Sequence, residues 1–287
     1  TSDPEAVIES SDAHDQDLEP ISGSFALSDL DVDDTLTASI VGSPVVKLDG
    51  EEIESGYPSS LTANGAFTIE PITQPSNGGS VTSIHYTYDP SGANLDFLRK
   101  DQTLTITYSV KVNDGHVDSV TQDVTFTIIG TNDGPFIEVK SGDSDRNELL
   151  ELADEDNDSD TEGETVDLSQ LTVSGTLTVN DLDLGDSASI THDDLIISGT
   201  FAEKYAATTY NDIPWGIEGF DPFAMLSFSP QDGIADYVGT SNNIHWTFNS
   251  TTELGNESFD FLAQGETLDL TYTVRATDEY GAYDTHN

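Results

Sequence analysis

Apolar and polar residues alternate along several short stretches of the chain. Leucine, isoleucine, valine and aromatic residues take every second position in residues 104–112, 124–128 and 268–274. A period of two with β-branched and aromatic residues predicts half-buried antiparallel strands. Turn signals such as Asp89-Pro90 and Asn113–Gly115 separate these stretches. Many short strands with regular turns are typical of an all-β sandwich with Greek-key connections.

The strand pattern occurs twice, in the same order. The matching segments are Gly23–Asp34 with Gly175–Asp186, His85–Tyr88 with His245–Phe248, and Thr103–Val110 with Thr267–Val274. Because the order is kept, we predict two tandem antiparallel β-sandwich domains, residues 1–133 and residues 134–287. Tyr108 and Tyr272 take equivalent places in the two copies, and both are expected to be largely buried.

The second copy differs from the first in three places. It carries an acidic loop (residues 148–164) and an insertion rich in aromatic residues (201–237), and it ends before any counterpart of the strand predicted at residues 123–129. Its last strand is therefore predicted to be missing, which leaves an exposed strand edge. The acidic loop fits either a calcium site or a disordered segment. The aromatic residues fit either a small core or a surface that stacks on sugars.

Negative charge dominates the composition. The chain has 55 Asp and Glu residues against 8 Lys and Arg residues, a formal charge of −47. Eight scattered cations cannot form the basic surface that nucleic acid or an anionic membrane requires. No apolar run reaches about 18 residues, so no membrane insertion is expected. Without cysteine there are no disulfides, thiolate catalysis or cysteine-type zinc sites. Carboxylates are too abundant for any pair to indicate an active site, and no Gly-x-Ser-x-Gly motif occurs, so we expect no enzyme.

Clustered aspartates suggest how this charge is neutralised. Self-repulsion opposes a compact state, and calcium accepts several carboxylates at one site. Neither acidic turn, Asp29–Asp34 or Asp181–Asp186, fits an EF-hand loop, which needs glycine at position 6 and glutamate at position 12. In such a sandwich the turn after the second strand, the last hairpin and the incoming linker lie at one end. The predicted calcium ligands are Asp29, Asp31, Asp34 and Asp114 in the first copy, and Asn132, Asp133, Asp181, Asp183, Asp186 and Asp278 around the junction. A solvated acidic turn is the alternative.

Three of the motifs resemble one known family. Gly175–Asp183 reads Gly-Thr-Leu-Thr-Val-Asn-Asp-Leu-Asp, Leu270–Val274 reads Leu-Thr-Tyr-Thr-Val, and Gly130–Pro135 reads Gly-Thr-Asn-Asp-Gly-Pro. Together they resemble VCBS repeats, the cadherin-like β-sandwich modules of long bacterial surface proteins that include RTX adhesins. The resemblance covers nearly the whole chain, apart from the acidic loop and the enlarged middle of the second copy. It implies tandem extracellular modules, often calcium-dependent, that take part in adhesion and biofilm formation.

These observations lead to one expected function and one alternative. We expect calcium-stabilised extracellular spacer modules of a bacterial surface adhesin, monomeric and partnered by neighbouring tandem modules of the same chain. One calcium ion is expected to join Asn132 and Asp133 to aspartates of the second copy and to stiffen the linker. The alternative is a ligand-binding adhesin module whose aromatic insertion holds a glycan or a peptide. An exposed, concave loop around Trp215 would favour the alternative.

Overall fold

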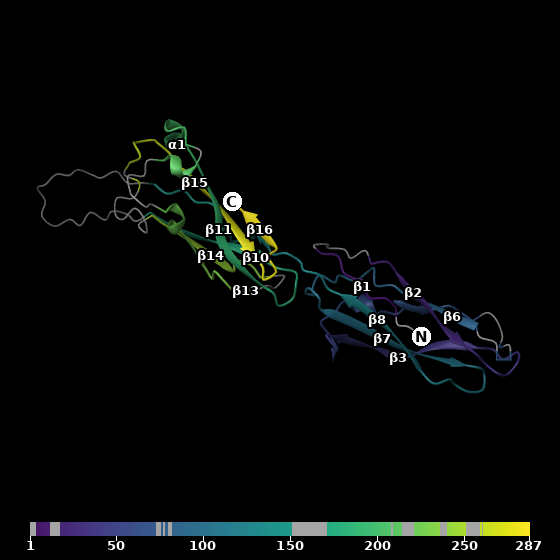
Figure 1. The fold of residues 1–287 in the computed structure, drawn as a ribbon. Coiled ribbons are helices and arrows are strands. Elements are labelled where there is room, and N and C mark those ends of the chain that lie inside the picture. The colour runs from purple at the N-terminus through teal and green to yellow at the C-terminus, as the bar shows by residue number, and fades with distance from the viewer. Residues whose placement is uncertain are drawn as a thin grey trace, which may run out of the picture. The chain divides into compact units, whose positions relative to one another are not determined.

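The chain divides into two compact units, shown in Figure 1 in a computed structural model. Unit 1 comprises Thr1–Asp133 and unit 2 comprises Gly134–Asn287. The structure describes residues 4–11, 18–72, 76, 78–79, 82–150, 171–207, 209–213, 221–235, 240–250, 259 and 261–287. Strands dominate these residues in both units, and the fold is all-β, as the alternation predicts. None of the helices in these ranges is long and apolar enough to span a membrane.

Unit 1 is built from two sheets. The larger sheet has the strand order β1–β8–β7–β3–β4, and the smaller has the order β2–β6–β5. Neighbouring strands are antiparallel except β1, which runs parallel to β8. The elements are β1 (Val7–Ile8), β2 (Ile21–Leu27), β3 (Thr37–Leu48), β4 (Glu51–Glu52), the 3-10 helix η1 (Ser59–Thr62), β5 (Phe67–Ile69), β6 (Thr82–Tyr88), β7 (Thr103–Asn113) and β8 (Gln122–Ile129).

The core of unit 1 follows from the period-two pattern. Every apolar residue at an even position of β7, from Leu104 to Val112, is buried, and the intervening residues are half-buried. Phe126 of β8 is fully buried and stacks on Tyr88, with 4.3 Å between the ring centroids. The hydroxyl groups of Tyr88 and Tyr108 both donate to the carbonyl oxygen of Leu61, at 3.1 and 3.3 Å. Two tyrosines, one from each sheet, therefore hold η1 against the core.

Unit 2 repeats the two-sheet plan with short helices added. Its sheets have the orders β12–β14–β10–β9 and β13–β11–β15–β16, with all neighbours antiparallel. The elements are β9 (Phe136–Glu138), β10 (Thr172–Asn180), β11 (Ser187–Ser198), α1 (Thr200–Lys204), η2 (Tyr210–Asp212), η3 (Pro222–Met225), β12 (Leu226–Ser229), β13 (Ile234–Ala235), β14 (Ile244–Asn249), β15 (Asp269–Thr277) and β16 (Tyr283–His286).

The two units also share two details of side-chain packing. The hydroxyl of Tyr272 donates to the carbonyl oxygen of Pro222 in η3 at 2.8 Å, as Tyr108 does to η1 in unit 1. Gly23 of β2 lies against the ring of Tyr86, and Gly175 of β10 lies against the ring of Trp246. A Cβ atom at either glycine would collide with the ring opposite, so glycine is required there. The repeated glycine is thus a packing feature of the sandwich.

The described part of the aromatic insertion forms its own small core. Phe201 and Ala202 of α1 are buried together with Ile213 and two residues of β11, Leu195 and Ile197. Tyr205 is 43% exposed. Trp215 and Tyr237 lie outside the described residues, so the expectation for the loop around Trp215 stays a prediction.

Separate cores predict separate unfolding. Both tryptophans belong to unit 2, so tryptophan fluorescence reports that unit alone, whereas circular dichroism reports both. Phe126→Ala removes a fully buried ring and should destabilise unit 1 by roughly 3–5 kcal/mol. The circular dichroism transition should then begin at lower urea, while the fluorescence transition stays in place. Val120→Ala, at a side chain that is 89% exposed, is the control. An equal shift of both transitions would show that the two units unfold together.

Candidate metal-binding sites

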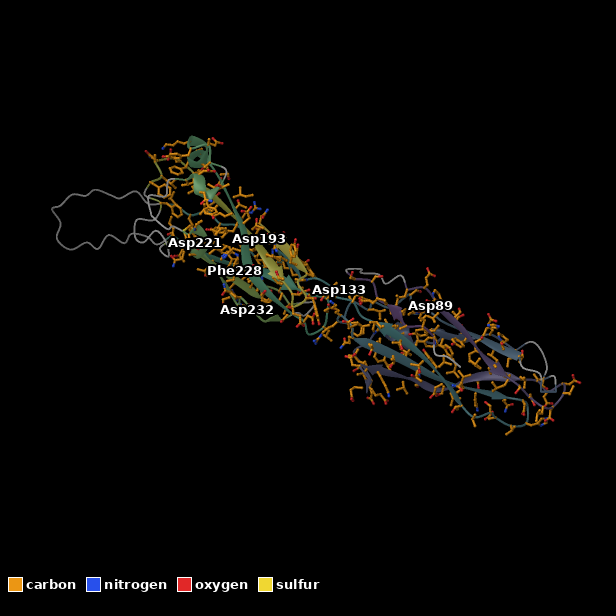
Figure 2. The ribbon with its side chains drawn as sticks, in the orientation of Figure 1. Asp89, Asp133, Asp193, Asp221, Phe228 and Asp232 are labelled. Atoms are coloured by element: carbon orange, nitrogen blue, oxygen red, sulfur yellow. The ribbon has the colours of Figure 1, made fainter. Side chains whose placement is uncertain are left out.

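Three buried carboxylates meet at one end of unit 1. Glu9 follows β1, Asp96 lies in the connection between β6 and β7, and Asp133, which is labelled in Figure 2, follows β8. Their exposed fractions are 3%, 3% and 0%. Each contributes an oxygen to a group whose members all lie within 4.8 Å of one another. Acidic side chains on the surfaces of the units, such as Asp89 and Asp232, are by contrast exposed (Figure 2).

Backbone contacts at the strand ends hold this group together. The amide of Glu9 donates to the carbonyl of Ile129 at 2.9 Å, and the amide of Thr131 donates to Glu9 Oε2 at 2.7 Å. The side chain of Asn94 donates to Asp96 Oδ2 at 2.9 Å. Gly130 lies against the backbone of Leu98, where a Cβ atom would collide. Glycine therefore lets the end of β8 approach the connection that carries Asp96.

Electrostatics make Glu9 an unusual member of the group. Burial raises its pKa to about 7, and the charges of Asp133 and Asp96 act in the same direction, while hydrogen bonds from Thr131 oppose them. Its Oε1 atom is buried and has no hydrogen-bond partner in the described part of the chain. Carboxylates this close repel one another unless a proton or a cation lies between them. An oxygen-only group of this kind suits a hard cation such as calcium.

A second group lies at the opposite ends of the same strands. Asp29 and Asp34 come from the β2–β3 connection and Asp114 from the β7–β8 connection, and their carboxylate oxygens also lie within 4.8 Å of one another. All three side chains are half-buried, and Asp29 Oδ2 has no hydrogen-bond partner among the described residues. Backbone amides of Val117 and His116 donate to Asp114 and lower its pKa. Asp31 is exposed and lies outside this group.

The corresponding aspartates of unit 2 are more deeply buried. Asp181, Asp183 and Asp186 are at most 2% exposed, and Asp278 is 7% exposed. The amide of Asp183 donates to Asp181 Oδ1 at 3.1 Å. Asp278 Oδ1 accepts the amides of Tyr280 and Ala282, at 2.8 and 2.9 Å, which shapes the turn before β16. Within the described ranges these four carboxylates do not form a group as tight as the two of unit 1.

The sequence singled out some of these residues and missed others. It predicted Asp29, Asp31, Asp34 and Asp114 as one group, and the structure brings all of them together except Asp31. It did not single out Glu9 or Asp96, although Asp96 begins the sequence Asp-Phe-Leu (residues 96–98), which recurs at residues 260–262 of the second copy. Whether Asn132 and Asp133 share an ion with aspartates of unit 2 stays a prediction. The acidic residues 154–164 lie outside the described residues.

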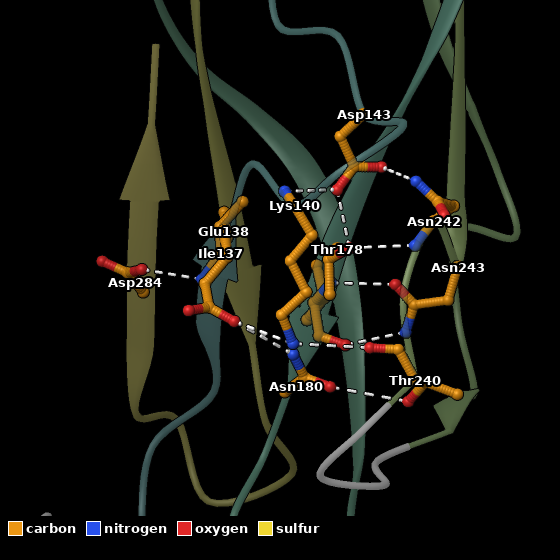
Figure 3. A network of polar contacts seen from close by, with 11 residues as sticks. Ile137, Glu138, Lys140, Asp143, Thr178, Asn180, Thr240, Asn242, Asn243 and Asp284 are labelled. Carbon is orange, nitrogen blue, oxygen red and sulfur yellow. Dashed lines mark hydrogen bonds and ion pairs between the residues drawn. The ribbon is translucent and has the colours of Figure 1, made fainter.

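One further acidic residue of unit 2 has a structural role. Figure 3 shows Asp143 beside β10, where it accepts hydrogen bonds from the side chains of Thr178 and Asn242 and from the amide of Lys140. Burial alone would raise the pKa of Asp143, but these hydrogen bonds outweigh it and lower the pKa. The Lys140 ammonium pairs with Glu138 at 2.9 Å. Asp143 thus fixes the segment that follows β9 by hydrogen bonds.

Comparison with known proteins gives distant structural likenesses. No family model and no curated protein matches the chain. The human ASH/PapD-like domain 7 of CEP192 is 14% identical, with a TM-score of 0.26 over 44% of this chain and 80% of that chain. The C-terminal domain of the Streptococcus agalactiae AgI/II polypeptide BspA is 10% identical, with a TM-score of 0.23 over 99% of this chain and 94% of that chain. Likenesses this distant assign neither a family nor a function.

The pKa of Glu9 predicts a pH dependence in the metal-free protein. Because the folded-state pKa is about 7 and the ordinary value is 4.5, the folded state holds an extra proton between these values. The contribution of Glu9 to the stability of unit 1 is therefore full below about pH 4.5 and is lost as the pH rises through 7. With chelator present, Glu9→Gln should be more stable than the parent chain at pH 8, and the difference should shrink towards pH 5. Urea unfolding at both pH values tests this, with exposed Glu51→Gln as the control. Parallel profiles for Glu9→Gln and the parent would contradict the assignment.

Proposed function

We propose that the chain is a pair of calcium-binding spacer modules of a bacterial surface adhesin. The observation that carries this proposal is the group formed by Glu9, Asp96 and Asp133, three carboxylates that are at least 97% buried with oxygens within 4.8 Å of one another. Leaving several ionised carboxylates together out of water costs several kcal/mol per ion unless a cation compensates. A bound divalent cation removes that cost and adds its binding free energy to the stability of the fold.

Calcium fits the donor set better than other common ions. The group offers only carboxylate oxygens, without histidine or cysteine, which argues against zinc and the softer transition metals. Magnesium requires near-ideal octahedral geometry and usually keeps several waters, whereas calcium accepts six to eight oxygens in flexible arrangements. Calcium sites in extracellular modules typically have Kd values of roughly 10⁻⁴ to 10⁻³ M. A site of that affinity is filled outside cells and empty inside them.

The spacer role rests on where the carboxylates lie. Each unit has its own apolar core, and the two groups of unit 1 lie at the two ends of its strands. The VCBS resemblance of the sequence motifs supports tandem extracellular modules partnered by modules of the same chain. The alternative, a glycan- or peptide-binding module, would use the aromatic insertion. Exposed Tyr205 favours that role, but buried Phe201 and Ile213 show that much of the described insertion serves packing.

Calcium should stabilise unit 1 through the buried group. At a hundredfold excess over Kd, a ligand that binds only the folded state adds about 2.7 kcal/mol. Calcium titration of the chelated chain should therefore raise the urea midpoint of unit 1, which is the part of the circular dichroism change that tryptophan fluorescence does not follow. The double variant Glu9→Gln and Asp96→Asn removes two of the three charges with little change in shape and should abolish most of this shift.

Matched variants separate this effect from charge screening. Glu51→Gln with Glu19→Gln also removes two charges from unit 1, both at exposed positions. That pair should keep the full calcium response. Sodium chloride at equal ionic strength should not reproduce the response, because screening acts on all surface charges. An equal loss in both double variants, or an equal gain with sodium, would show that calcium acts only as a general counter-ion.

Unit 2 allows an independent test through tryptophan fluorescence. Calcium should raise the fluorescence-monitored urea midpoint because Asp181, Asp183 and Asp186 are buried. Asp183→Asn, at a fully buried carboxylate, should reduce that calcium-dependent shift by more than half. Asp232→Asn, at an exposed position of unit 2, should leave the shift intact. If calcium does not change the fluorescence-monitored midpoint of the parent chain, unit 2 does not bind calcium. The proposal for unit 1 would then still stand.

A further inference from the structure

β1 is held at the edge of its sheet by few contacts. Within the described residues 4–11, Val7 and Ile8 pair with β8, and the amide of Glu9 adds one hydrogen bond to that strand. Val7 is partly buried against the core, whereas Ile8 is 63% exposed. In this described segment, Glu9 is the one buried residue. The side chain that anchors the segment is therefore a carboxylate and not an apolar group. We call residues 7–9 the strap.

The other two carboxylates belong to a part of unit 1 that is held together without the strap. The amide of Gly130 donates to the carbonyl oxygen of Gln102 at 2.9 Å, and the amide of Asp101 donates to the carbonyl oxygen of Gly130 at 3.0 Å. These bonds join the end of β8, which Asp133 follows, to the connection that carries Asp96. Two of the three carboxylates therefore stay close to each other whether or not the strap is in place.

The strap adds the third carboxylate to this pair. Glu9 Oε2 accepts the amide of Thr131 at 2.7 Å and its hydroxyl at 3.3 Å, but Glu9 Oε1 is buried without a hydrogen-bond partner among the described residues. Without a cation, Asp96 and Asp133 repel the carboxylate of Glu9, and burial removes the water that would otherwise solvate it. The short pairing of the strap offers little to offset this cost, because local stability depends on buried apolar contacts.

We propose that a divalent cation controls the strap: an ion bound by Glu9, Asp96 and Asp133 holds residues 7–9 against β8, and loss of the ion releases them. This inference rests on the proposed function, because it assigns a further consequence to the same ion site. Release uncovers the side of β8 that faces away from β7. An uncovered strand edge is a place where other extended segments pair. The ion therefore determines whether unit 1 presents a covered or an open edge.

Hydrogen exchange of single amides in the full chain tests the proposal. The amide of Glu9 bonds to β8, and the amide of Thr131 bonds to the side chain of Glu9, so both should exchange slowly only while the strap is docked. The amide of Gly130, which bonds to Gln102, is the internal reference. Exchange is compared at pH 8 in excess calcium and in chelator. Chelation should speed exchange at Glu9 and Thr131 at least about tenfold and leave Gly130 unchanged.

Variants can remove the repulsion without supplying an ion. Asp96→Asn with Asp133→Asn leaves Glu9 as the last carboxylate of the group, so the chelated variant should show the slow exchange of the calcium-bound parent. Glu19→Gln with Glu51→Gln removes two exposed charges from unit 1 and should keep the fast exchange of the chelated parent. Slow exchange along β7 shows that a variant is folded. If the double variant does not fold, Asp96→Asn alone should give a rate between those of the chelated and the calcium-bound parent.

Three results would overturn the proposal. The first is slow exchange at Glu9 and Thr131 in the chelated parent, because the strap would then dock without an ion. If calcium still raises the urea midpoint of unit 1 in that case, the proposed function stands. The second is equal acceleration at Gly130, because the whole end of the unit would then open. The third is fast exchange in the folded, chelated double variant, because repulsion would not be what releases the strap. If calcium changes neither the midpoint nor the exchange rates, the proposed function fails as well.

Discussion

Burial of like charges is the constraint on which the ends of these sandwiches depend. Glu9, Asp96 and Asp133 are withdrawn from water with their oxygens within 4.8 Å of one another. Such a group persists only if a proton or a cation offsets the repulsion. Because the pKa of Glu9 is about 7, a proton partly neutralises this group near neutral pH. At higher pH a divalent cation would have to neutralise it instead. The hydrogen bonds from Thr131 hold Glu9 in place in either case.

The carboxylate groups of unit 1 form because strand ends that are distant in sequence meet at the two ends of the sandwich. The parallel pair Ile8–Ile129 sets Glu9 beside Thr131, so residues more than a hundred positions apart share one site. At the other end of the sandwich, the pairing of Thr37 with Asn113 places the β2–β3 connection beside Asp114. The cores fix these registers, because a slip by one residue would turn each apolar set towards water. The free energy of apolar packing therefore holds the carboxylates in place.

How far the sequence predicts this structure depends on the range of the contacts. Alternation in residues 104–112 is local, and it predicted the strand and its buried face. Repetition predicted that Tyr108 and Tyr272 are equivalent, and both donate to a backbone carbonyl of a short helix. Glu9 was missed because its role depends on a parallel pairing that no local pattern reveals. The helix α1 was missed because five residues are too few to show a helical period.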